Sequence, residues 1–76
     1  MTLDQMQDGL PFVIDTLHSQ GELRRRLVDM GFIAGAEGTV LRRAPLGGPI
    51  ELRIGRSRLA LRLTEAQLVS VIPSHA

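Results

Sequence analysis

The chain has 76 residues, no cysteine, and nine arginines but no lysine against eight acidic residues, for a formal charge of +1. This length predicts one small domain over residues 1–76 that buries only about 60% of its unfolded surface and has no disulfide or thiolate-bound metal to stabilise it. The small charge excess argues against nucleic acid as a partner, no apolar run reaches the ~20 residues of a membrane span, and the N-terminus lacks a signal-peptide pattern. We therefore expect a cytoplasmic protein that does not insert into a membrane.

Three helix starts are indicated by a Ser or Thr followed three residues later by Glu or Gln, a pair in which each side chain can cap the other's amide. The pairs are Thr2 with Gln5, Ser19 with Glu22, and Thr64 with Gln67. Only the middle pair precedes an apolar stripe at helical spacing, formed by Leu23, Leu27 and Met30. This stripe predicts a helix over residues 20–30, and the other two pairs predict no more than a turn or two.

Alternating apolar residues indicate strands, which we expect at residues 12–17, 38–44, 50–54, 59–63 and 68–72. Residues 55–58 are predicted to form a hairpin loop that pairs Ile54 with Leu59, Leu52 with Leu61 and Glu51 with Arg62. Five short antiparallel strands, with the helix between the first two, favour a mainly β fold that curls into a small, partly open barrel, because closure protects strand edges. Residues 73–76 are expected to be a flexible tail.

The stretch DMGFIAGAEG at residues 29–38 contains three glycines. A phosphate-binding loop would need a strand before it, a helix after it and a lysine, whereas these glycines follow a helix and the chain has no lysine. We therefore predict structural roles. Gly31 should cap the helix in a left-handed conformation, Gly35 and Gly38 should turn the chain into the next strand, and Pro49 should end the turn formed by residues 45–49.

Chemistry-bearing motifs are sparse in this sequence. No nucleophile motif surrounds any serine and no His and carboxylate pair is placed to activate one, so we do not expect an enzyme. The two histidines, His18 and His75, are weak metal candidates, because no pair of ligands has the spacing of a known site; no cofactor is predicted, although a divalent metal could bind at an interface. A metal-binding or metal-sensing role stays open as an alternative. RNA binding through the arginines is a less favoured one, because the chain lacks Tyr and Trp for base stacking.

Four sequence pieces in fixed order carry a family pattern: a helix end, a spaced glycine, a Pro- and Gly-rich turn, and a Leu-rich strand that leads into an acidic turn. They consist of Arg26, Leu27, Met30 and Gly31; Gly35; Ala44, Pro45, Gly47 and Pro49; and Leu59, Leu61, Arg62, Glu65 and Ala66. With this pattern the chain resembles the FeoA family of bacterial ferrous iron transport proteins across nearly its whole length. One departure is Gly48, where many members have Asp.

The resemblance implies an SH3-like barrel, in agreement with the strand pattern. It also implies a cytosolic accessory protein that works with FeoB, the membrane protein with a GTP-binding domain through which ferrous iron enters. The same barrel occurs as the terminal domain of iron-dependent repressors. The absence of DNA-binding helices in this chain favours a regulatory binding module for the FeoB-type transporter over a repressor.

A contact surface for this partner is predicted where apolar residues fall in loops, after the helix and in the PLGGP turn. The predicted contact residues are Met30, Phe32, Ile33, Pro45, Leu46 and Gly47. The alternative is that these residues cap the ends of the barrel. The exposed edges of a partly open barrel also allow self-association without requiring it.

Overall fold

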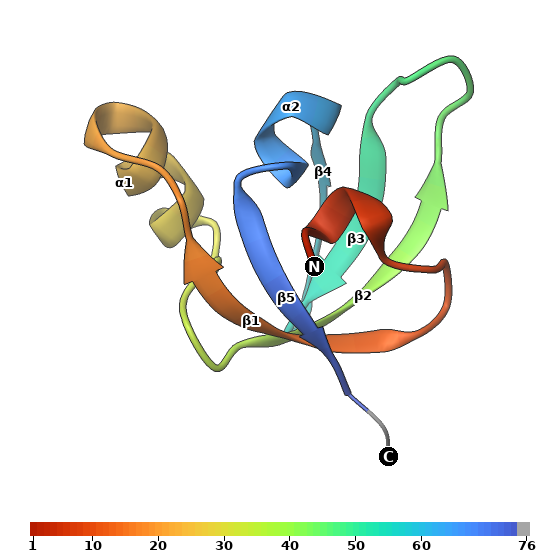
Figure 1. Cartoon of the computed structure of the whole chain (residues 1–76), viewed down its shortest axis with the longest axis horizontal. Helices are drawn as coiled ribbons and strands as arrows, with labels where there is room; N and C mark the ends of the chain where they lie inside the picture. Colours follow the sequence, from red (N-terminus) through yellow and green to blue (C-terminus); the bar gives the residue numbers. More distant parts are fainter. Residues whose placement is uncertain (75–76) are drawn as a thin grey trace.

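The computed structural model describes residues 1–74. Its elements are η1 (Leu3–Gln5), β1 (Pro11–Leu17), α1 (Gly21–Asp29), β2 (Glu37–Arg43), β3 (Ile50–Ile54), β4 (Ser57–Leu61), α2 (Leu63–Ala66) and β5 (Val69–Pro73). The five strands form one antiparallel sheet in the order β4-β3-β2-β1-β5, which curls strongly without closing (Figure 1). The predicted mainly β, partly open barrel with its helix between the first two strands is therefore confirmed.

The core is mainly aliphatic, includes both phenylalanines, and lies inside the curl of the sheet. Side chains alternate along each strand, so Phe12 and Ile14 of β1 point inward while their neighbours are more exposed. A β-bulge between residues 14 and 16 shifts this alternation by one residue, and Leu17 rather than Thr16 then faces the core. No polar or charged residue in the described part of the chain is buried, so apolar packing carries the stability of the fold.

The hairpin between β3 and β4 differs from the prediction. Its turn contains only Gly55 and Arg56, because Ile54 pairs with Ser57 and not with Leu59. Gly55 has a φ of +57°, which suits the first central position of a type II′ turn and explains how two residues are enough.

The predicted register of this hairpin is consequently wrong by two residues on β4. Leu52 pairs with Leu59 instead of Leu61, and Glu51 lies opposite Ala60 instead of Arg62. A slip of two residues keeps each side chain on its predicted face of the sheet, so the inward and outward sets are unchanged. The strand also ends earlier than expected, and residue 63 begins α2.

The helix caps agree with the sequence at one of three places. The Thr2 amide donates to the Gln5 side chain (3.2 Å), as the first predicted pair requires. The second prediction is wrong, since α1 takes Gln20 as its N-cap residue and has no side-chain cap. The third is also wrong, because the carboxylate of Glu65 caps the amide of Arg62 (2.9 Å) and α2 begins one residue before the predicted cap.

Both described ends of the chain are held against the sheet. Pro73 pairs with Phe12, and the Ser74 amide donates to the Pro11 carbonyl (3.0 Å), so the first half of the predicted tail is ordered; residues 75–76 lie outside the described part. At the other end, the Val71 amide donates to the Met1 carbonyl (2.8 Å), and residues 1–2 thereby cover the free edge of β5.

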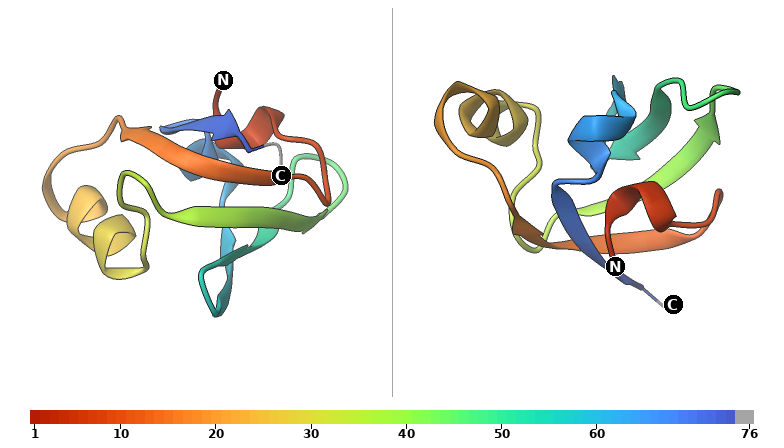
Figure 2. Two further views of the ribbon diagram at one scale, coloured as in Figure 1. Left: turned by 90° about the horizontal axis from the view of Figure 1, so that it is seen from below. Right: turned by 45° about the horizontal axis from the view of Figure 1, so that its top comes forward.

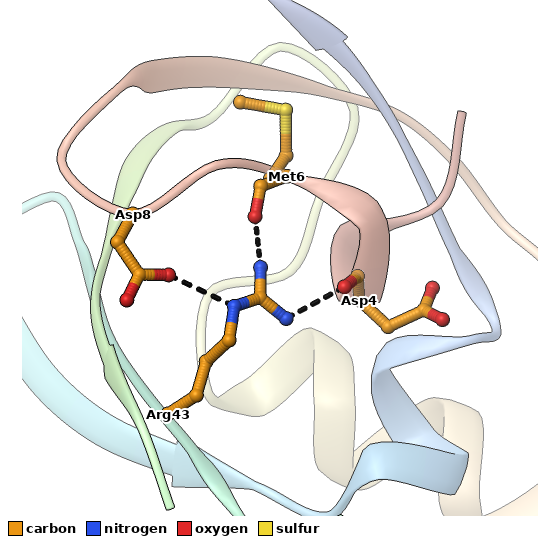
Figure 3. A network of polar contacts seen from close by, with 4 residues as sticks. All are labelled: Asp4, Met6, Asp8 and Arg43. Carbon is orange, nitrogen blue, oxygen red and sulfur yellow. Dashed lines mark hydrogen bonds and ion pairs between the residues drawn. The ribbon is translucent and has the colours of Figure 1, made fainter.

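Arg43 fastens the N-terminal segment to the end of β2 (Figure 3). Its guanidinium donates to the carbonyl of Asp4 (2.6 Å), to the carbonyl of Met6, and to the carboxylate of Asp8 (2.8 Å). The planar fork of donors suits three acceptors that converge from one loop. Residues 1–8 are thus fixed over one side of the barrel, which leaves β4 as the edge strand without such a cover.

Candidate functional site

The loop after α1 is shaped by the way in which the helix ends. Gly31 has a φ of +106°, its amide donates to the Val28 carbonyl (2.9 Å), and the Phe32 amide donates to the Leu27 carbonyl (2.9 Å). These two bonds constitute a Schellman motif, in which the residue after the glycine contacts the apolar residue one turn back. Phe32 and Leu27 are both fully buried. The loop therefore inserts its phenylalanine into the core.

This burial corrects the predicted contact surface. Phe32 has no exposed area and cannot touch a partner, so its predicted role is wrong. Met30 is half-buried and packs against the core, while Ile33 remains 51% exposed. Ile33 is thus the main apolar side chain that this loop presents to solvent.

The two glycines that follow have different roles. Gly35 has a φ of +89° and its amide donates to the Ile14 carbonyl (2.8 Å), so it turns the chain towards β2. Gly38 does not turn the chain, contrary to the prediction, because it lies within β2 and has no positive φ. A Cβ there would lie 2.5 Å from the Arg53 carbonyl oxygen and 2.8 Å from the ring of Phe12. Glycine is needed at position 38 for close packing.

The turn between β2 and β3 presents its apolar residue to solvent. The Gly48 amide donates to the Pro45 carbonyl (3.2 Å), and the two central residues, Leu46 and Gly47, have φ values of +60° and +74°. Two successive positive φ values define a type I′ turn, for which Asn-Gly is the favoured pair. Leu46 is fully exposed and is the one non-glycine residue in the described part with a positive φ, which costs about 1–2 kcal/mol.

The two loops do not form one surface, which corrects the prediction that they do. The first precedes β2 and the second follows it, so they lie at opposite ends of that strand (Figures 1 and 2). The loop after α1 exposes Ile33 at one end of β2. The β2–β3 turn exposes Pro45, Leu46 and Gly47 at the other end. Only the turn combines full exposure with a strained backbone.

Shallow hollows flank this turn on both sides. One, of about 350 Å³, is bounded by Arg42, Arg43, Ala44, Pro45, Pro49, Glu51 and Ala60. The other, of about 320 Å³ and mostly apolar, is bounded by Gly47, Gly48, Pro49, Arg62, Leu63 and Thr64. Pro49 separates the two hollows at the start of β3.

The outer face of β2, β3 and β4 carries charges that the predicted register did not place. Glu51 accepts a hydrogen bond from Arg58 (2.8 Å) and lies 3.7 Å from the guanidinium of Arg42. The hydrogen bond from Arg58 is the main reason that the pKa of Glu51 is lowered, and the positive charges of Arg42 and Arg58 add to the effect. Arg53 lies directly opposite Arg58. A two-residue hairpin turn, had it been read from the sequence, would have placed these two arginines side by side.

A family model described as the FeoA domain matches residues 1–73. The chain belongs to the FeoA family. A curated relative, the Fe(2+) transport protein A/Fe(2+) transporter FeoB fusion protein of Porphyromonas gingivalis, is 34% identical over 71 residues, which make up 93% of this chain and 8% of that protein.

Solved FeoA structures share the fold. The solution structure of iron(II) transport protein A from Clostridium thermocellum is 42% identical with a TM-score of 0.89, over 93% of this chain and 44% of that one. The crystal structure of Stenotrophomonas maltophilia FeoA, complexed with zinc and described as an SH3 domain protein, is 32% identical with a TM-score of 0.82, over 95% and 89% of the two chains. This chain therefore spans less than half of the curated relative and of the Clostridium chain.

His18 is the one predicted metal candidate within the described part of this FeoA chain. The Nε2 atom of His18 lies 2.8 Å from the hydroxyl of Ser70, and within residues 1–74 no three His, Asp or Glu side chains are grouped so as to hold a metal ion. His75 falls outside the described residues. None of the helices in the described part is long and apolar enough to cross a membrane.

The structure also gives a steric reason for the glycine at position 48 of this FeoA chain. A Cβ on Gly48 would lie 2.7 Å from the Cβ of Ala44, so a side chain there needs a shift of the turn. The glycine and the left-handed Leu46 belong to the same tight turn, and this conformation leaves no room for a polar side chain at position 48.

Proposed function

We propose that this FeoA chain is a cytoplasmic accessory and regulatory module of a ferrous iron uptake system, which acts by contact with a FeoB-type membrane GTPase transporter. The observation that carries the proposal is the Porphyromonas gingivalis relative, in which an FeoA part and the FeoB transporter are one polypeptide. A covalent link holds two modules at a high effective concentration, which benefits modules that bind each other. Iron is the cargo of the transporter in this proposal, and the chain contributes binding and not catalysis.

The contact is assigned to the β2–β3 turn. Leu46 is fully exposed, apolar, and held in a conformation that favours Asn or Gly. Strain of this kind persists where the surroundings enforce it and is concentrated at functional sites. Pro45 and Gly47 shape the turn on either side of it, and the hollows beside them can receive the partner's side chains.

The test compares two single substitutions at opposite ends of β2. Tagged wild-type protein, Leu46→Asn and Ile33→Asn are each incubated with detergent-solubilised FeoB-type transporter from the same organism, and the bound transporter is quantified. We expect Leu46→Asn to lose at least about tenfold in affinity, as for an apolar hot spot, while Ile33→Asn changes it less than twofold. Asn suits a left-handed turn position, so the fold of the Leu46→Asn variant is retained.

Each other outcome has a defined meaning. Equal binding by all three proteins keeps the partner but moves the contact away from the turn. A loss restricted to Ile33→Asn assigns the contact to the loop after α1. No binding by wild-type protein, with or without GTP on the transporter, contradicts the proposed function.

A further inference from the structure

The outer face of β2, β3 and β4 carries more arginines than carboxylates. Three arginines, Arg42, Arg53 and Arg58, share this face with two carboxylates, Glu51 and, at the start of β2, Glu37, so one positive charge is left in excess. Arg53 makes no ion pair in the described part of the chain. Around these side chains lies a hollow of about 410 Å³, which shares Arg42 and Glu51 with the hollow beside the β2–β3 turn.

Arg53 and Arg58 form an unfavourable pair in the free protein. Like charges directly opposite each other on antiparallel strands destabilise a sheet. The pair is also the closer of the two types of cross-strand pair. A two-residue turn is closed by a hydrogen-bonded pair, here Ile54 with Ser57, and the next pair along the hairpin is the non-hydrogen-bonded kind, with its Cα atoms about 4.5 Å apart. A negatively charged ligand would relieve this repulsion.

The same alternation leaves backbone groups of β4 free. If Ser57 and Leu59 exchange hydrogen bonds with β3, then the amide and carbonyl groups of Arg58 and Ala60 point away from the sheet. No backbone hydrogen bond from another described segment reaches either residue, and both are exposed. The opposite edge strand, β5, is covered by residues 1–2. An open edge of this kind can accept an extended peptide as an additional strand.

We propose that β4 and the arginines beside it bind an extended acidic segment of a partner protein, which adds to the sheet as a sixth strand. The backbone of the segment pairs with Arg58 and Ala60, and its alternate side chains place carboxylates over the guanidinium groups of Arg58 and Arg53. This inference goes beyond the proposed function, because it defines the chemistry of the ligand and holds for whichever protein carries the segment. Its site is the β4 edge and not Leu46.

The geometry also explains the position of Glu51. Its carboxylate occupies Arg58 in the free protein (2.8 Å) and stands where a ligand carboxylate would bind. It therefore acts as an internal competitor, which a ligand carboxylate must displace before it can bind Arg58. Removing that competitor should strengthen ligand binding.

The probe is a fluorescein-labelled ten-residue peptide of alternating Glu and Thr, which as a strand presents all its carboxylates on one face. A second peptide with five Glu followed by five Thr has the same composition and charge. Binding to the full chain is measured by fluorescence anisotropy at low salt. We expect the alternating peptide to bind at least about fivefold more tightly than the block peptide, with an affinity that falls as salt rises.

Four variants test the site. Arg58→Ser should weaken the alternating peptide about tenfold, whereas Arg25→Ser, which removes the same charge from an exposed position on α1, should weaken it less than twofold. Glu51→Gln should strengthen binding about threefold. Ala60→Pro removes an outward-facing amide without breaking the β3–β4 ladder and should weaken binding about tenfold, since proline is tolerated on an edge strand when its nitrogen faces solvent.

Several results would overturn the proposal. Equal affinity for the two peptides, or equal losses for Arg58→Ser and Arg25→Ser, would reduce the effect to the net charge of the protein. Displacement of the peptide by oligouridine at lower concentration than by unlabelled peptide would identify nucleic acid as the better ligand. A wild-type dimer that Ala60→Pro converts to a monomer, as seen by sedimentation, would show that a second copy occupies the edge.

Discussion

The loop after α1 and the turn between β2 and β3 have similar compositions and opposite exposures. Each places a glycine with positive φ beside a large apolar residue, Gly31 beside Phe32 and Gly47 beside Leu46. In the loop, hydrogen bonds back to the last turn of the helix direct Phe32 into the core. In the turn, the bond from the Gly48 amide to the Pro45 carbonyl closes the chain around Leu46 and leaves this residue at the tip. The apolar neighbour of the glycine is therefore buried where the glycine ends a helix, and exposed where the glycine lies in a hairpin turn.

The largest effect on stability is expected from a substitution of Phe32, the buried residue of the two. Phe32→Ser removes a fully buried ring, and loss of a buried Phe costs about 3–5 kcal/mol. A domain of this size has about 4–11 kcal/mol of stability in total, so the variant should lose a large fraction of its free energy of unfolding. Urea denaturation followed by circular dichroism measures the change.

Ile33→Ser is the matched control, because it changes the neighbouring residue, which is half exposed. Its free energy of unfolding should stay within about 0.5 kcal/mol of the wild-type value. Equal losses for the two variants would show that the loop packs as a unit and would remove the contrast between Phe32 and Ile33.

The second test compares the cost in stability of replacing Gly31 with that of replacing Gly47. Gly31→Ala must adopt a φ of +106° and brings its Cβ to 3.1 Å from the Cγ2 atom of Ile54, so it should cost about 2–3 kcal/mol. Gly47→Ala meets nothing closer than Leu63 at 3.8 Å and should cost only the conformational strain, about 1 kcal/mol. Denaturation midpoints in urea give both values. A reversed order would mean that the turn, and not the helix end, is the more constrained of the two.

The third effect has the opposite sign. Leu46→Asn places a residue that tolerates the left-handed region at the first central position of a type I′ turn, so it should stabilise the protein by about 0.5–1 kcal/mol. Leu46→Ala keeps the backbone strain but removes the apolar side chain, so it tests the side chain alone. It should leave the free energy of unfolding nearly unchanged. Thermal unfolding of both variants measures this difference. A destabilised Leu46→Asn would show that the leucine packs on the protein itself.

The alternation of apolar residues predicted the strands and their inward faces. A shift of the register by two residues leaves each side chain on the same face of the sheet, so the wrong register did not affect this prediction. The β3–β4 register itself could not be read, since Gly55 fits a two-residue turn as well as the first position of a longer loop. The predicted caps at α1 and α2 failed for a related reason. Ser19 and Thr64 matched a local motif, but the N-cap of α1 lies one residue after Ser19 and the N-cap of α2 lies two residues before Thr64.

The burial of Phe32 could have been predicted from one further signal. In a Schellman motif the residue after the glycine contacts the residue four positions before that glycine, and here both are apolar, Phe32 and Leu27. The strain at Leu46 had no such signal, because nothing in PLGGP requires leucine to adopt a positive φ. The free β4 edge and its opposed arginines depend on the register, which only the three-dimensional structure supplied.

The smallest effect concerns pH and the charged end of the sheet. The pKa of Glu51 is lowered in the folded protein, chiefly by the hydrogen bond from Arg58, so its ionised form is favoured by folding. The stabilisation is fully present above the ordinary carboxyl pKa of about 4.3 and is lost as the pH falls through the lowered value. The ion pairs are largely exposed, so the loss should be small and weaker in high salt.

This titration should also be local, which extends the comparison between the two ends of β2. Glu51 borders the hollow beside the β2–β3 turn, whereas the apolar Schellman motif lies at the far end of the strand. An acid titration followed by NMR should therefore move the amide signals of Ala44 and Leu46 with the midpoint of Glu51 and leave that of Phe32 in place. Glu51→Gln should abolish the movement. A shift of the Phe32 amide at the same midpoint would show that the two ends are coupled through β2, because the charge itself is screened within about 10 Å.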